Sequence, residues 1–170
     1  MEDDAPILIC YDDSTDARHA INVAASLLID RRAVVLDVAP TLTVAESYAA
    51  LGAVTPNFEE LNAEDGLARA HAGAELARRA GFMAEARAEV AAPTWDGVVE
   101  VADEIEAAVI VLGSRGLTGA RELLKGSFSH EVAEHAGRPV LIVPPPRAAG
   151  KQSAKRYSSG ALTWSSRSPE

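Results

Sequence analysis

Four positions in the last third of the chain have the spacing of an anion-binding loop. Gly113 ends an apolar run, Gly116 follows after two residues, and Gly126 and Ser127 come after nine more. Glycine lets the backbone adopt a positive φ and approach a ligand closely, because it has no Cβ. Gly126 and Ser127 precede a helical pattern, and the free N–H groups and dipole at a helix N-terminus favour an anion. The spacing therefore predicts a cradle for an anionic ligand.

The side chains of this segment allow more than one role. Ser127 can cap the helix, direct its hydroxyl to a phosphate, or do both, and Ser129 follows in the same first turn. Arg115 and Arg121 lie in the loop, where they either contact phosphates or stay solvated. The segment is not a Walker A loop, because no Gly-Lys-Ser/Thr follows a glycine-rich run. In the competing interpretation the glycines only form turns and Ser127 only caps the helix.

A second polar group follows the first apolar run. Asp12, Asp13 and Asp16 surround a turn and the expected start of a helix, where carboxylates act either as turn and helix-end groups or as ligand contacts. Cys10, the only cysteine, lies within the run "PILICY" and is interpreted as a small buried hydrophobe. A single cysteine excludes an intrachain disulfide and a cluster of thiolates around a metal, which suits a reducing cytoplasm.

The histidines and acidic residues do not predict an efficient enzyme. His130 with Glu134, and Glu131 with His135, have i, i+4 spacing on the last expected helix, and we interpret them as surface ion pairs rather than metal ligands. The sequence also shows no nucleophile with a neighbouring general base, and no pair of carboxylates whose spacing indicates a hydrolytic enzyme. The sequence therefore favours a binding protein without a resident metal.

Strands and helices alternate along the chain. Runs rich in Val, Ile and Leu, together with one alternating, charged run typical of an edge strand, predict strands over 6–11, 33–38, 83–90, 107–113 and 138–144. Apolar spacing predicts a helix over 15–30 with Ser14 as N-cap, and one over 66–80 with Leu67, Ala70, Ala74 and Ala77 inward, ending at Gly81. Two further helices are expected to begin at Thr94 and Ser127.

This alternation predicts a doubly wound α/β fold in three layers, within a single domain over 1–146. Ligands of such sheets bind beyond the carboxyl ends of the strands, where "CYDDS", "LDVAP" and "GSRG" are expected to gather. Residues 40–62 form a long connection without a clean period, and 147–170 form a basic tail whose composition predicts disorder.

Charge and hydropathy narrow the class of partner. The 170 residues carry a formal net charge of −9, which argues against a general nucleic-acid or membrane-surface binder. The first residues lack the basic-then-apolar plan of a signal peptide, and no apolar run is long enough to span a membrane. We therefore expect a soluble, cytoplasmic protein.

The pattern Gly113-x2-Gly116-x9-Gly126-Ser127 resembles the nucleotide-binding signature of the universal stress protein family. The segments "ILICYDDSTDARHAINVA", "AAVIVLGSRGLTG" and "GSFSHEVAEHAGRPVLIVP" are similar to that family's first strand, turn and helix and to its last third. The resemblance covers about residues 5–145. It implies a five-stranded parallel sheet in the order 3-2-1-4-5, ATP as ligand, and a homodimer formed through the strand at 138–144.

The resemblance also implies roles for individual residues. It places Asp12 against the adenosine part and Val38 in the adenine pocket, with Tyr11 flanking that pocket. The implied ribose and phosphate contacts are Gly113, Ser114, Gly116, Gly126, Ser127, Phe128 and Ser129, and the residue types of the loop add Arg115 as a candidate phosphate contact. Asp13 stands where the family often has glycine, so its carboxylate either turns away or holds a divalent cation such as Mg²⁺ with the phosphates.

Two classes of function follow. In the first, the protein binds ATP and acts in stress response or regulation through its nucleotide state and dimerisation, with at most slow ATP hydrolysis. In the second, it is a nucleotide-independent dimeric module that recruits a protein partner. An enzyme that activates substrates as adenylates is disfavoured, because no Ser-Gly-Gly-x-Asp-Ser loop follows the first strand.

Overall fold

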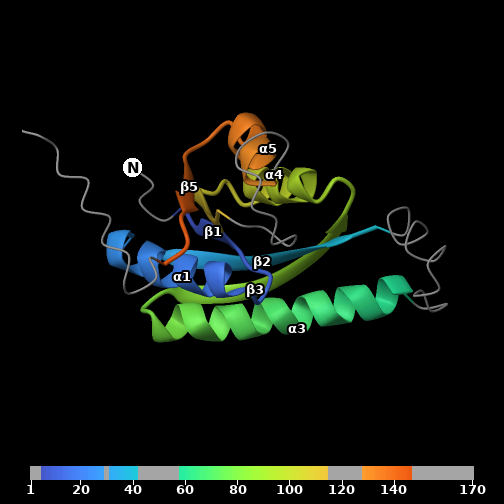
Figure 1. Cartoon of the computed structure of the whole chain (residues 1–170), viewed down its shortest axis with the longest axis horizontal. Coiled ribbons are helices and arrows are strands. Elements are labelled where there is room, and N and C mark those ends of the chain that lie inside the picture. The colour runs from blue at the N-terminus through green and yellow to red at the C-terminus, as the bar shows by residue number, and fades with distance from the viewer. Residues whose placement is uncertain (1–4, 29–30, 42–57, 115–127, 147–170) are drawn as a thin grey trace, which may run out of the picture.

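The computed structural model describes residues 5–28, 31–41, 58–114 and 128–146. Five parallel strands form one sheet in the order β3-β2-β1-β4-β5, with helices on both faces (Figure 1). The strands are β1 (Ile7–Cys10), β2 (Arg32–Pro40), β3 (Met83–Ala91), β4 (Val109–Gly113) and β5 (Val140–Val143). The helices are α1 (Thr15–Leu27), α3 (Phe58–Arg79), α4 (Thr94–Glu104) and α5 (Phe128–His135). The doubly wound α/β class and the strand order are both confirmed.

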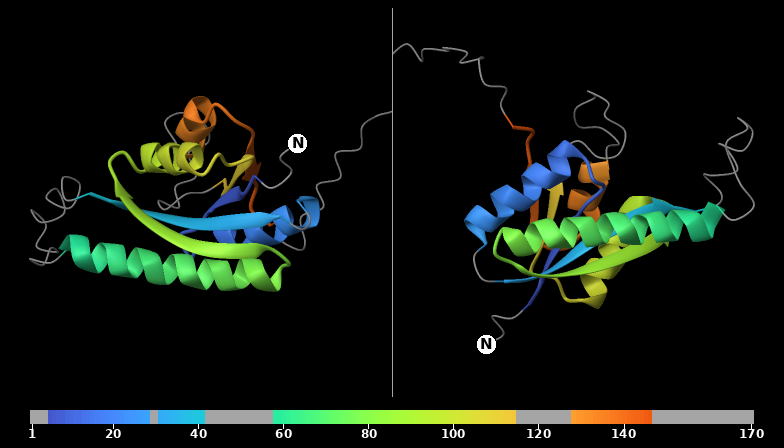
Figure 2. Two further views of the ribbon diagram at one scale, coloured as in Figure 1. Left: turned by 180° about the vertical axis from the view of Figure 1, so that it is seen from behind. Right: turned by 90° about the horizontal axis from the view of Figure 1, so that it is seen from below.

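The central strand β1 is covered on both of its faces. Ile7 and Ile9 pack in one core cluster with residues of α1 and α3, whereas Leu8 packs in a second cluster with residues of α4 and α5. Figure 2 shows α1 and α3 side by side on one face of the sheet. This double cover explains the uninterrupted apolar runs, because a strand between two helical layers has no solvated face. The edge position predicted for β3 is also confirmed.

The helix α1 begins where the sequence indicated. The Ser14 hydroxyl oxygen accepts a hydrogen bond from the Ala17 N–H at 3.1 Å, which confirms Ser14 as the N-cap. At the end of α3, Gly81 has a φ of 108°, the left-handed conformation expected of a glycine after a helix. Both helix ends therefore follow from local residue types.

The helix α3 differs from its prediction in length and in its inward face. It begins at Phe58 rather than at 66, and the prediction began late because the residues before 66 lack the apolar period on which it relied. Ala70 and the alanines one and two turns later are fully buried, as expected, but Leu67 is 43% exposed. Small residues form the face that meets the sheet: a Cβ added at Gly73 would lie 2.7 Å from the Tyr11 ring. Glycine there permits a close approach of α3.

One arginine joins the second helical layer to the sheet. The Arg138 guanidinium donates hydrogen bonds to the carbonyl oxygens of Ala102 at 2.7 Å and Ala107 at 2.8 Å, and it pairs with the Asp103 carboxylate. These acceptors lie at the end of α4 and just after it, where helix carbonyls lack intrahelical partners. Arg138 therefore anchors this helix end beside the start of β5.

Candidate functional site

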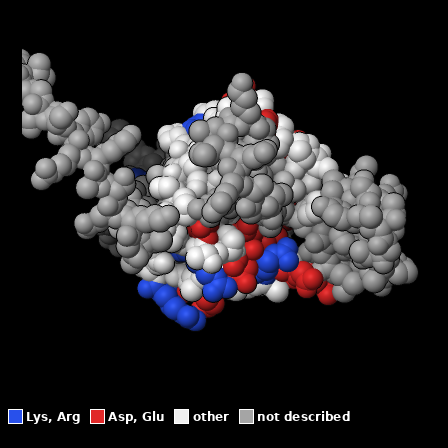
Figure 3. All heavy atoms as spheres, viewed as in Figure 1, with Lys and Arg blue, Asp and Glu red and all other residues white. Residues whose placement is uncertain are grey.

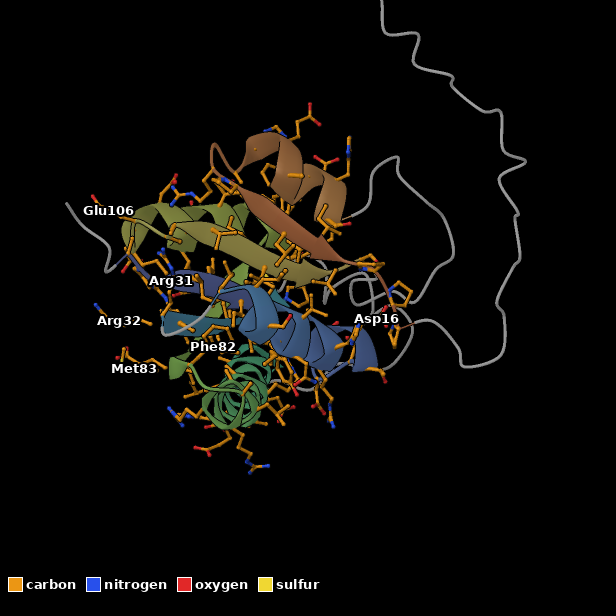
Figure 4. All side chains as sticks on the ribbon, turned by 90° about the vertical axis from the view of Figure 1, so that its left-hand side faces the viewer. Asp16, Arg31, Arg32, Phe82, Met83 and Glu106 are labelled. Carbon is orange, nitrogen blue, oxygen red and sulfur yellow. The ribbon has the colours of Figure 1, made fainter. Side chains whose placement is uncertain are left out.

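The carboxyl ends of β1, β2 and β4 meet at one edge of the sheet, where α1 begins. β1 lies between the other two strands, with Cys10 opposite Leu36 of β2 and Ile9 opposite Val111 of β4. If the β1–β2 register is continued by two residues, Asp12 lies opposite Val38. If the β1–β4 register is continued by two residues, Gly113 lies beside the turn that follows β1. In Figure 4, Asp16 of α1 marks this edge, and Arg31, Arg32 and Met83 lie at the opposite end. The sequence placed the end of β4 correctly and that of β1 within one residue, whereas β2 continues to Pro40, two residues beyond its predicted end at 38.

The turn after β1 holds its two carboxylates differently. The Asp12 Oδ1 atom accepts a hydrogen bond from the Ser14 N–H at 3.1 Å. The Oδ2 atom of Asp12 is not the acceptor in this hydrogen bond. Asp13 has a φ of 61°, and its Oδ1 accepts hydrogen bonds from the Tyr11 hydroxyl at 2.8 Å and from Arg18 at 2.5 Å. These bonds hold the pKa of Asp13 below its ordinary value. This geometry fits the alternative in which Asp13 turns away from the ligand.

Tyr11 and Val38 lie on opposite faces of the sheet. The Tyr11 ring is buried in the cluster with α1 and α3, and burial together with its bond to Asp13 raises the pKa of its hydroxyl to about 12. Val38 is buried in the other cluster, and a Cβ added at Gly97 of α4 would lie 3.2 Å from its Cγ1. The structure therefore does not bring the Tyr11 side chain beside that of Val38.

Gly113 has a packing role that the sequence did not reveal. Its φ is outside the positive range that Gly81 and Gly137 adopt, so the conformational freedom of glycine is not used here. A Cβ at this position would lie 3.1 Å from the backbone C and the Cβ of Asp16, closer than ordinary contact. The absence of a Cβ lets the end of β4 approach the first turn of α1. Next to it, the Ser114 N–H donates to the Val143 carbonyl at 2.8 Å.

The start of α5 supplies the remaining described residues of the predicted site. Phe128 begins the helix and packs against the α4 side of the core, and Ser129 in the same turn is 6% exposed. Four predicted ligand residues lie outside the described residues, namely Arg115, Gly116, Gly126 and Ser127. Their roles remain predictions.

Sequence reasoning missed a buried ion pair beside this edge. Asp37 is 3% exposed, and Arg69 of α3 reaches it with two hydrogen bonds, Nε to Oδ2 at 2.7 Å and Nη2 to Oδ1 at 2.9 Å. Burial raises the pKa of the Asp37 carboxyl, and the bond to Arg69 offsets part of this effect. The Asp12 charge also raises the pKa of both partners. A carboxylate within the apolar run "VVLDVA" was the available signal.

The charged surface beside α3 is mixed rather than uniformly acidic. Figure 3 shows acidic and basic side chains side by side over the lower part of the molecule in that view.

On α5, His130 lies 3.5 Å from Glu134 and His135 lies 3.6 Å from Glu131, which confirms the two predicted side-chain pairs. Among the described residues, no helix is both long and apolar enough to cross a membrane.

The fold is that of a doubly wound α/β protein. Its candidate ligand site lies where the carboxyl ends of β1, β2 and β4 meet, which is where the strand order reverses. Residues 5–144 match the model of the universal stress protein family. The chain belongs to that family.

Individual relatives agree with this assignment. Universal stress protein MJ0531 of Methanocaldococcus jannaschii is 31% identical over 133 residues, which are 77% of this chain and 74% of that protein. Universal stress protein YxiE of Bacillus subtilis is 44% identical over 46 residues, which cover 27% of this chain and 31% of YxiE. The matched segment therefore spans less than a third of that second relative.

Solved structures share the fold over most of the chain. Hypothetical protein PH0823 superposes with a TM-score of 0.65 at 26% identity, covering 84% of this chain and 97% of that one. A universal stress protein in complex with cAMP gives a TM-score of 0.60 at 22% identity, over 83% and 97% of the two chains. The universal stress protein from Archaeoglobus fulgidus in complex with dAMP gives 0.57 at 23% identity, over 81% and 96%.

Proposed function

We propose that this chain is an ATP-binding universal stress protein that acts in stress response or regulation through its nucleotide state and its dimerisation. The convergence of Asp12, Val38 and Gly113 at the switch in strand order carries this proposal. Solved neighbours with the same fold bind the adenine nucleotides cAMP and dAMP, which supports an adenine nucleotide as the class of ligand.

In the proposed complex the phosphates lie between residues 113–116 and the start of α5. Backbone N–H groups at 126–129 would meet the outer phosphates, and Arg115 and a bound Mg²⁺ would balance their charge. In this complex the Oδ2 of Asp12 would accept a hydrogen bond from the adenosine part, since its Oδ1 already accepts one from Ser14. No general base is assigned, and ATP hydrolysis is at most slow.

The proposed homodimer forms through the strand at 138–144 in the cytoplasm. β5 is an edge strand of the sheet, and Ile142 on it is 38% exposed. An exposed apolar edge strand promotes aggregation unless it is covered, and pairing with a symmetry mate covers both copies at once. Light scattering at tens of micromolar should therefore give the mass of a dimer.

Titration calorimetry of the full chain tests the nucleotide site. ATP with Mg²⁺ should bind in the micromolar range, about −8 kcal/mol. Asp12→Asn keeps the acceptor for Ser14 but replaces Oδ2 by a donor, so a donor group of the ligand would lose its acceptor, and affinity should fall about tenfold or more. Asp13→Asn is the matched control, because its Oδ1 remains available to Tyr11 and Arg18. If the two variants bind ATP with equal affinity, Asp12 does not contact the nucleotide.

One observation favours the second candidate, a nucleotide-independent dimeric module that recruits a protein partner. The close approach to Asp16 accounts for Gly113 without any ligand. A ligand of the native state must raise its melting temperature. If millimolar ATP with Mg²⁺ leaves the melting temperature unchanged, the interaction module is the better description.

A further inference from the structure

The helix α5 carries a second group of side chains with ligand chemistry, none of which belongs to the predicted nucleotide site. Glu131, Glu134 and His135 each offer one ligand atom, and these atoms all lie within 4.8 Å of one another. Their spacing of three and four residues places them on one face of the helix. We call them the Glu-Glu-His cluster.

An aromatic contact from another helix holds the histidine of this cluster. The Trp95 ring of α4 stacks on the His135 imidazole, with ring centroids 4.6 Å apart and an interplanar angle of 20°. A ring that is already held in place loses less freedom when it binds a ligand. Trp95 therefore pre-orients the imidazole, although it carries no ligand atom itself.

One distance within the cluster is close to that between two ligands of the same ion. The His135 Nε2 and a Glu131 carboxylate oxygen are 3.6 Å apart, which is too long for a good hydrogen bond. Two ligand atoms that both bind tetrahedral zinc at its usual bond lengths lie roughly 3.3 Å apart. The ion pairs inferred from sequence also leave the Glu134 carboxylate beside that of Glu131, a repulsion that a cation between them would remove.

From this geometry we propose that Glu131, Glu134 and His135 bind a first-row divalent transition metal such as Zn²⁺ or Ni²⁺. One imidazole nitrogen and two carboxylate oxygens suit these ions better than Mg²⁺, which prefers oxygen ligands alone. All three ligands come from one helix and are partly exposed, so water completes the coordination shell. The site shares no residue with the proposed nucleotide site and needs no nucleotide.

The stacked tryptophan gives the site a direct optical signal. The chain has two tryptophans, so Trp164→Phe leaves Trp95 as the only indole. Ni²⁺ should quench this fluorescence in a saturable titration of the nucleotide-free full chain in chelator-free buffer. Equilibrium dialysis should give one ion per chain at saturation. Quenching that rises linearly with Ni²⁺ and never saturates would overturn the proposal.

Substitutions on the exposed helix face separate a metal site from surface ion pairs. In the Trp164→Phe background, Glu134→Gln and His135→Gln should each raise the Ni²⁺ midpoint about tenfold or more, since each removes a ligand. His71→Gln on α3, outside the cluster, is the control and should leave the midpoint unchanged. The proposal is wrong if Glu134→Gln binds Ni²⁺ as well as the control does. Because Glu134 is 59% exposed, this variant should fold even if His135→Gln does not.

Discussion

Removing the guanidinium of Arg69 should destabilise this protein far more than an ordinary surface ion pair would suggest. Asp37 is 3% exposed and accepts two hydrogen bonds from Arg69, so Arg69→Met leaves a buried carboxylate without its counter-charge. Unit charges about 4 Å apart attract by ~4 kcal/mol at an effective dielectric constant of about 20. Breaking one side of a buried pair typically costs about 3–5 kcal/mol. We expect a loss within that range.

Urea unfolding at neutral pH measures this loss, and a second ion pair supplies the control. Arg87 contacts Glu104 at 2.5 Å, but the Glu104 side chain is 63% exposed, so water screens the pair. Arg87→Met should cost no more than about 1 kcal/mol. Combining Arg69→Met with Asp37→Leu should recover much of the lost stability, because no unpaired charge is then buried.

The pH dependence gives the loss a specific signature. Without Arg69, burial and the Asp12 charge act on Asp37 unopposed and raise its folded pKa further above the unfolded value. The native state then binds this proton more tightly than the unfolded state, so acidification through that pKa favours folding. The deficit of Arg69→Met relative to the wild type should therefore shrink as pH falls from neutral. A deficit equal to that of Arg87→Met, or one independent of pH, would refute a buried, charged Asp37.

Two further predictions concern the neighbouring strand ends. Gly113→Ala should lower the free energy of unfolding by about 1–3 kcal/mol, because its Cβ would crowd the Asp16 backbone, and an unchanged urea midpoint would contradict that packing. Stability should also fall as pH rises from about 9 towards 12. Burial raises the pKa of the Cys10 thiol from 9.0 and of the Tyr11 hydroxyl from 10.0, each to about 12, so only the unfolded chain ionises these groups in that window. Urea midpoints measured across this pH range test the second prediction. In the Cys10→Ala variant, the fall in stability at the lower end of this pH range should be smaller.

Local signals in the sequence were enough for most of the fold. Apolar runs predicted β1, β2, β4 and β5, because strands packed between helical layers are rich in Val, Ile and Leu, and the alternating, charged run predicted β3 at the edge. Ser14 and Gly81 marked helix ends, because capping depends on residues within one turn. The early start of α3 was missed, because its first turns have no apolar period. Leu67 was placed inward wrongly, because the close contact of α3 with the sheet is made by glycine and alanine.

The sequence by itself determined the order of elements, the family resemblance and the strand ends where a ligand is expected, because these depend on residue type and local spacing. Only the tertiary structure decided which distant side chains meet. Asp37 and Arg69 are 32 residues apart in the chain, and α4 supplies the ring that holds His135. The close packing of Gly113 against the backbone of α1 at Asp16 is another such contact, and its ligand role stays a prediction. Contacts of this kind depend on how layers pack, which no local pattern records.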